Sequence, residues 1–213
     1  MAIVQNPITG RTRGKFSTAV FSKQFGKNTM RSKALSVRNP KSPEQLDQRA
    51  KFNAALAFVR SVISIVRVGY AKFASGMSAY NACMRQVMLE AIGGSYPNYD
   101  ITYADVMLAQ GPLTGFSAPS AIAAPGKKIN FAWTDNTGQG NASDSDIFCY
   151  GILNKDSGEV YSGVSASTRQ DGSLKVTTSA QATDKVEVYG FFISATTGEA
   201  SDSVYLGEHT IVD

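Results

Sequence analysis

Few residues of this chain have the types and spacing that catalysis requires. The single histidine, His209, lies in a run of strand-like residues near the C-terminal end, so a serine–histidine–carboxylate triad would need its base inside an expected strand. Residues 10–15, GRTRGK, superficially resemble a phosphate-binding loop, but they follow no strand and open no helix. We therefore expect no catalytic residues and no enzyme.

Three carboxylates deserve comparison with a cation site. Asp135, Asp144 and Asp146 flank the loop 136–145, and carboxylate oxygens are ligands that Ca²⁺ accepts. The spacing has no EF-hand register, and Asp, Asn and Gly are also the ordinary residues of loops between strands. Cys83 and Cys149 lie far apart without a CxxC pattern, so we expect two buried apolar side chains. We expect no metal and no cofactor.

The most distinctive segment is the basic N-terminal arm. From residue 1 to residue 43 the chain carries nine Lys or Arg and no acidic residue, and the first carboxylate is Glu44. Phenylalanines lie between these cations, a combination that suits phosphate neutralisation and base stacking in nucleic-acid binding. The candidate contact residues of the arm are Arg11, Arg13, Lys15, Phe16, Phe21, Phe25, Arg31 and Lys33.

A protein partner explains the aromatic residues of the arm better. Residues 16, 18, 20 and 22 alternate with residues 17, 19, 21 and 23 as in an extended strand on a surface, and Gly26 opens a plausible turn into a second strand over 29–37. Such a segment can add to the sheet of another subunit. We favour this reading over nucleic acid, and an arm folded on its own helices stays as a third alternative.

Charge is distributed unevenly along the chain. Residues 1–90 carry 15 basic and three acidic side chains, whereas residues 91–213 carry six basic and 14 acidic ones. The two halves therefore have balances of +12 and −8. Such asymmetry indicates a nucleic acid, a membrane surface, or the acidic half of a neighbouring copy as the partner of the basic half.

Helices are expected directly after the arm. Residues 42–45, SPEQ, place a serine at the N-cap, proline at N1 and glutamine at N3. Apolar residues then recur at helical spacing through residue 70, which predicts one helix ending near Gly69. A second helix is predicted over 78–92, before Gly93 and Gly94. The short link between them predicts an antiparallel pair, and we assign 1–41 to an extended arm and 42–111 to a helical domain.

The remaining chain predicts a β-sandwich. Residues 112–126, rich in Pro, Gly, Ser and Ala, indicate a linker. Residues 127–213 alternate short apolar runs with turn residues, which is typical of an immunoglobulin/fibronectin-like sandwich that folds alone, with Trp133 in its core. Strands are expected at 129–133, 147–153, 159–162, 173–178, 185–194 and 203–212. The expected fold class is α+β: extended arm, antiparallel helix pair and C-terminal sandwich.

Three segments resemble a known group of sequences. Residues 31–52 (with QRAKF at 48–52), residues 129–143 (with DNTGQGNAS) and SVYLG at 203–207 resemble an uncharacterised family of roughly 210-residue proteins from Bacteroidota and their mobile elements, including phages. The resemblance covers nearly the whole chain. It implies that arm, helices and sandwich occur together as one unit, and it brings no catalytic residues.

We therefore expect a non-enzymatic structural protein that assembles in many copies, such as a capsid, head-decoration or neck protein of a phage-like particle, or a subunit of a filament or tube. Its partners would be copies of itself and other structural proteins. The alternatives are a nucleic-acid-binding protein using the arm and a glycan-binding module using the sandwich loops. The N-terminus lacks the apolar core of a signal peptide, and the apolar window 54–68 is too short to span a bilayer. We expect synthesis in the host cytoplasm, no membrane partner, and location in the assembled particle.

Overall fold

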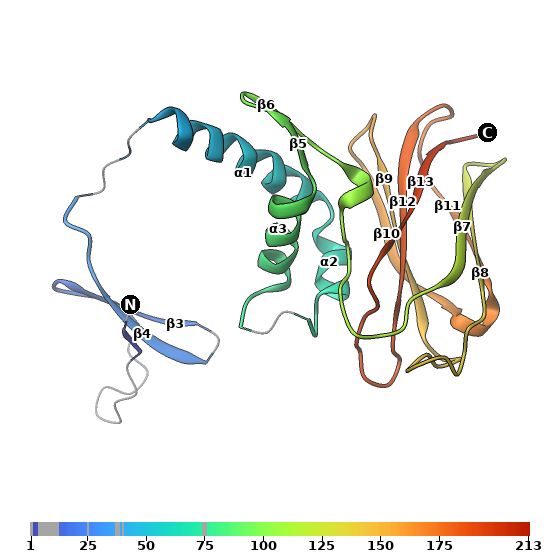
Figure 1. Ribbon diagram of the computed structural model, residues 1–213, viewed down its shortest axis with the longest axis horizontal. Coiled ribbons are helices and arrows are strands. Elements are labelled where there is room, and N and C mark those ends of the chain that lie inside the picture. The colour runs from blue at the N-terminus through green and yellow to red at the C-terminus, as the bar shows by residue number, and fades with distance from the viewer. Residues whose placement is uncertain (1, 4–12, 25, 37–38, 40, 74–75) are drawn as a thin grey trace. The chain divides into compact units, whose positions relative to one another are not determined.

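The computed structural model describes residues 2–3, 13–24, 26–36, 39, 41–73 and 76–213 (Figure 1). The chain forms two compact units, Met1–Gln45 and Leu46–Asp213. The division falls in the first turn of helix α1, Pro43–Ser61, slightly after the expected end of the arm at residue 41. The two units are described separately below.

The N-terminal unit contains a four-stranded antiparallel sheet with the strand order β1-β4-β3-β2. Tight turns make this sheet possible, because Ser17 (φ 49°) and Gly26 (φ 80°) both adopt the left-handed region at the two chain reversals. Residues expected to form an extended arm therefore fold into a small antiparallel sheet instead. Its strands are β1 (Ala2–Ile3), β2 (Gly14–Phe16), β3 (Ala19–Gln24) and β4 (Lys27–Ser32).

Three helices follow, and serine side chains cap the first and the third. The backbone N–H of Gln45 donates to Oγ of Ser42 at the start of α1, and the N–H of Asn81 donates to Oγ of Ser78 at the start of α3. Helix α2 covers Ile63–Gly69 and α3 covers Ala79–Glu90. The pair α2 and α3 contact one another, as expected for helices joined by a short link.

The first expected helix is broken rather than continuous. Oγ of Ser61 donates to the carbonyl oxygen of Phe58 at 2.7 Å, and Val62 leaves helical geometry (φ −95°, ψ 9°). Serine hydroxyls that bond to the preceding turn bend helices, and here α1 and α2 meet at 82°. Within the described part of the chain no single helix is long and apolar enough to cross a membrane, and only the bent pair α1 and α2 together meets that length and composition.

A short hairpin and a 3₁₀ turn connect α3 to the β-rich part of the larger unit. Strands β5 (Ile92–Ser95) and β6 (Asn98–Ile101) form the hairpin, and η1 covers Tyr103–Asp105. Ile101 ends β6, and residues 102–109 contain η1 but no strand.

Six strands of the larger unit coincide with the six apolar runs expected from the sequence, although β10 extends further than expected. They are β8 (Lys128–Thr134), β9 (Ile147–Asn154), β10 (Val160–Thr168), β11 (Ser173–Thr177), β12 (Lys185–Ile193) and β13 (Val204–Thr210). A second 3₁₀ turn, η2 (Arg169–Asp171), joins β10 to β11.

Together with β7 (Ser117–Ala124), these strands form two antiparallel sheets, with the orders β10-β9-β12-β13 and β11-β8-β7. Two facing antiparallel sheets of four and three strands with these strand orders form a sandwich of the immunoglobulin/fibronectin type. This confirms the expected fold class of helices combined with a C-terminal sandwich.

Strand β7, Ser117–Ala124, occupies the segment where a linker was expected. Its composition is unusual for a strand because it contains Pro119. Proline is tolerated there because β7 lies at the edge of its sheet and the pairing with β8 shifts register between Ser117 and Ser120, where Ala118 has φ 45°. The sandwich therefore begins before residue 127.

The two sheets enclose an inter-sheet core. Its centre is aromatic: Trp133 stacks on Phe148 with ring centroids 4.6 Å apart, and Phe116 and Phe192 contact both rings. Trp133 is 7% exposed, so the expected core position of this residue is confirmed. Leu113, Ile129, Phe131, Ile152, Val176, Val186, Val188 and Ile211 belong to the same buried cluster.

A second buried cluster, the helix–sheet core, joins the helices to the outer face of sheet β10-β9-β12-β13. It contains alternate residues of β9 and β12, among them Cys149, Phe191 and Tyr189, together with helix residues such as Val66 and Val87. Figure 1 shows α2 and α3 on one side of this sheet and the sheet β11-β8-β7 on the other. The larger unit is thus a three-layered body, which differs from the expected separation of a helical domain (42–111) from a sandwich domain (127–213).

Candidate functional site

The register of the N-terminal sheet gathers four apolar side chains on one face. Residues paired across antiparallel strands lie on the same face, and Phe16 pairs with Ala19 while Phe21 pairs with Met30. Ala19 and Phe21 are two residues apart in β3, so both pairs lie on one face. We call Phe16, Ala19, Phe21 and Met30 the apolar face of the N-terminal sheet, and the paired residues Lys23 and Asn28 lie on the same side at its end.

This arrangement differs from the simple alternation expected over residues 16–23. The turn at Ser17 and Thr18 reverses the chain, so that Phe16 shares a face with Ala19 and Phe21 rather than with Val20. The turn is closed further by the N–H of Lys33, which donates to the carbonyl oxygen of Thr18 at 2.6 Å.

The apolar face is open to solvent. Phe16 is 76% exposed and Met30 is 37% exposed. Among the residues of this unit whose burial is described, only the hydroxyl residue Thr29 is buried. The described residues of the sheet therefore form no hydrophobic core, and a small sheet of this kind is marginally stable on its own.

The opposite face of the N-terminal sheet is basic. Val20 lies between Lys15 and Arg31 in one cross-strand row, and Lys27 pairs with Gln24 in another. Lys15, Lys27 and Arg31 are exposed. We call Lys15, Lys27 and Arg31 the basic face.

The structure places the other candidate contact residues as follows. Arg13 and Lys33 are exposed and flank the sheet, before β2 and after β4. Arg11 and Phe25 lie outside the described residues. Among the expected contact residues, Phe16 and Phe21 lie on one face of the sheet, and Lys15 and Arg31 lie on the other. The structure adds Met30 to the apolar face, a residue that was not among the expected contact residues.

The two units differ in charge. Residues 1–45 carry nine basic and one acidic side chain, whereas residues 46–213 carry 12 basic and 16 acidic ones. The N-terminal unit therefore has a formal charge of +8 and the larger unit −4.

The larger unit has a pocket of about 390 Å³ beside helix α3, lined by both apolar and polar side chains, which we call the α3 pocket. Among the large hydrophobic side chains in its lining, Leu89 is 71% exposed and Phe73 is 46% exposed. The lining residues are Phe73, Met77, Ala82, Arg85, Gln86, Leu89, Glu90 and Gln110.

One wall of the α3 pocket is fixed by a buried amide. Nε2 of Gln86 donates to the carbonyl oxygen of Asp105 at 2.7 Å and to Glu90 at 3.2 Å, and Oε1 accepts from the N–H of Met107 at 3.1 Å. These bonds tie α3 to the segment that follows η1, so the pocket keeps its shape without a ligand.

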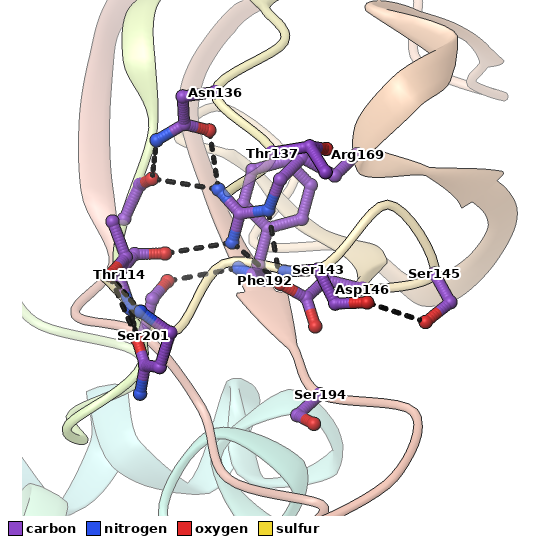
Figure 2. Close-up of polar contacts among 12 residues, drawn as sticks. Thr114, Asn136, Thr137, Ser143, Ser145, Asp146, Arg169, Phe192, Ser194 and Ser201 are labelled. Atoms are coloured by element: carbon purple, nitrogen blue, oxygen red, sulfur yellow. Dashed lines mark hydrogen bonds and ion pairs between the residues drawn. The ribbon is translucent and has the colours of Figure 1, made fainter. Parts of the chain in front are cut away.

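A buried ionic cluster lies at the end of the sandwich (Figure 2). The Arg169 side chain is fully buried, and all five of its N–H donors have acceptors. Nε and Nη2 contact Oδ2 of Asp146, both at 3.0 Å, and Nη1 donates to Oδ1 of Asn136 at 2.6 Å. The carbonyl oxygens of Gly115 and Thr114 accept the remaining two bonds, from Nη1 at 2.9 Å and Nη2 at 2.8 Å.

The surroundings of this cluster complete its packing. The guanidinium lies over the ring of Phe192, 4.0 Å from the centroid, and the backbone carbonyl of Arg169 accepts from Nε1 of Trp133 at 2.8 Å. Because every donor of Arg169 is already used, the guanidinium has none left for an anionic ligand. We interpret the cluster as a clamp that joins the segment before β7 to the loops that precede β9 and β11.

The carboxylates weighed as calcium ligands have other roles in the structure. Asp135 accepts from the N–H and the hydroxyl of Thr137, which lowers the pKa of its carboxyl, and Asp146 belongs to the clamp. Oδ1 of Asp146 is buried and accepts no hydrogen bond. Among the described residues no group of three His, Cys, Asp or Glu side chains could hold a metal ion.

The remaining reactive residue types are held in structural positions. His209 lies in β13 with Nε2 3.0 Å from the carbonyl oxygen of Leu206. Cys83 and Cys149 are both free and buried, and burial raises the pKa of each thiol to about 12. Sequence reasoning missed the clamp and the α3 pocket. The exposed helix position Leu89 is the signal that could have indicated the latter.

Comparison with solved structures finds domains with a similar sandwich. The fibronectin type III domain of human collagen alpha-1(XX) chain is 15% identical, with a TM-score of 0.36 over 47% of this chain and 87% of that one. The FN5 domain of Drosophila Lar is 12% identical, with a TM-score of 0.33 over 46% of this chain and 95% of that one. A family 76 glycoside hydrolase from a bovine Bacteroides thetaiotaomicron strain is 15% identical, with a TM-score of 0.37 over 47% and 21% of the respective chains.

At these TM-scores the similarity supports no inference about function, and the assignment of the sandwich depends on the strand pairing described above. Comparison with curated proteins finds no match. Comparison with protein families matches residues 11–207, nearly the whole chain, to a family of unknown function. This bears out the resemblance to an uncharacterised family of about this length, and the chain belongs to the family of unknown function DUF6266.

Proposed function

We propose that this protein is a non-enzymatic structural protein that assembles in many copies, and that its N-terminal sheet binds a neighbouring subunit. A virion component of a phage-like particle, such as a capsid, head-decoration or neck protein, is the form we favour, and a filament or tube subunit is the close variant. Its partners would be copies of itself and other structural proteins, and it would be made in the host cytoplasm and reside in the particle.

One observation carries this proposal. The apolar face of the N-terminal sheet exposes Phe16 and Met30, with Phe21 half-buried beside them, on a unit that has no core among its described residues. Burying one such side chain contributes about 1.5–3 kcal/mol, so covering the face with a partner would stabilise both the sheet and the contact. A catalytic role would require a cluster of reactive groups around a pocket, and the α3 pocket is lined mainly by apolar and amide side chains.

Removing the N-terminal sheet tests the proposal. A chain that starts at Ser42 keeps the N-cap of α1, because Oγ of Ser42 accepts from the N–H of Gln45. We expect this truncated protein to fold and to have the mass of one chain by light scattering. The full-length protein should give a mass well above the 22.7 kDa of one chain. If the truncated protein forms assemblies with as many chains as the full-length protein, the proposed role of the sheet is refuted.

Nucleic-acid binding is a second candidate, because Lys15, Lys27 and Arg31 lie on the same face of the sheet and are all exposed. Phosphate-driven binding weakens steeply with salt, and about four neutralised phosphates predict a loss of roughly 100-fold when salt is raised fourfold. A gel-shift titration with a duplex and a single strand measures this. Sub-micromolar affinity at physiological salt with that steep dependence would favour the nucleic-acid role over assembly.

A further inference from the structure

No further inference is drawn: the strongest candidate, the open edge of strand β10 (Val160–Thr168) in the sandwich, contains no charged residue or proline that would oppose pairing with another strand, but nothing in the structure shows which strand would cover it.

Discussion

Two nitrogens of Arg169, Nε and Nη2, contact the same oxygen of Asp146, Oδ2, each at 3.0 Å, and both side chains are at most 1% exposed. The pair joins η2 to the loop that precedes β9 inside the sandwich. A buried ion pair of this kind adds little net stability when compared with apolar residues of the same shape, but removal of one partner leaves an unpaired buried charge.

We therefore expect Asp146→Ala to lower the free energy of unfolding by about 3–5 kcal/mol. The loss arises because the Arg169 guanidinium keeps its acceptors at Asn136 and the two carbonyls but loses its only counter-charge within the clamp. Urea unfolding followed by tryptophan fluorescence measures it, since Trp133 donates to the carbonyl of Arg169.

The neighbouring carboxylate supplies the control for this experiment. Asp144 is exposed, and its carboxylate accepts from the neighbouring hydroxyl of Ser143. Asp144→Ala should change the free energy of unfolding by about 0.5 kcal/mol or less. Equal effects of the two substitutions would contradict the clamp interpretation.

Trp133 allows a separate test of the inter-sheet core. Trp133→Ala should cost about 3–5 kcal/mol, because the ring stacks on Phe148 and is 7% exposed. Trp133→Phe keeps an aromatic ring but loses the bond from Nε1 to the Arg169 carbonyl, and should cost clearly less. Denaturant midpoints at an unchanged m-value measure both. A cost below about 1 kcal/mol for the alanine variant would place the ring outside the core.

The sandwich strands were predictable because their apolar runs and turn residues are local features. The runs 147–154 and 185–193 also indicate that both faces of their sheet are covered. They are apolar at nearly every position instead of alternating, which indicates strands buried on both faces. Phe148 lies in the inter-sheet core and Cys149 in the helix–sheet core, and this pattern explains why the helices cover the sandwich.

Other features depend on tertiary context. The composition of β7 is that of a linker, and only the edge position and the register shift near Ala118 make Pro119 acceptable. Arg169 is a lone basic residue between polar neighbours, so its burial depends on Asp146 and Asn136, which are distant in sequence. The break at Val62 depends on one serine hydroxyl bond. None of these has a periodic pattern from which it could be predicted.

The shared helix–sheet core changes what is expected of fragments. A fragment of residues 127–213 lacks β7 and exposes Cys149, Tyr189 and Phe191, so we expect it to aggregate or to unfold without cooperativity. A fragment of residues 42–213 keeps all three layers and should unfold in one cooperative transition. Thermal unfolding with size-exclusion chromatography distinguishes them. A soluble, cooperatively folding 127–213 fragment would show that the sandwich is independent of the helices.

The buried thiols give a simple test of the helix–sheet core. Burial raises the pKa of Cys83 and Cys149 from 9.0 to about 12, so at pH 8 only about one thiol in 10⁴ is ionised, and the thiolate is the reactive form. We expect neither thiol to react with a disulfide reagent at pH 8 in the native protein within an hour. Both should react within minutes in denaturant, which serves as the control. Rapid labelling without denaturant would mean that this core opens readily.

The last prediction uses the two faces of the N-terminal sheet. Lys15→Glu/Arg31→Glu changes the basic face, and Phe21→Ser/Met30→Ser changes the apolar face, while the backbone pairing of β2, β3 and β4 is the same for both. The charge variant should slow assembly, because complementary fields act mainly on association rate. Val20→Ser is the control, since Val20 lies on the basic face and carries no charge.

The finished assembly should respond in the opposite way. Exposed ion pairs contribute about 0–1 kcal/mol each and are screened by salt, whereas the burial of Phe21 and Met30 is little affected by ionic strength. The apolar-face variant should therefore dissociate at a clearly lower denaturant concentration, while the charge variant should dissociate near the midpoint of the unchanged protein. Light-scattering kinetics and dissociation midpoints measure both effects. If the charge variant dissociates easily and the apolar-face variant stays intact, the sheet acts as an electrostatic segment, and nucleic acid becomes the better-supported partner.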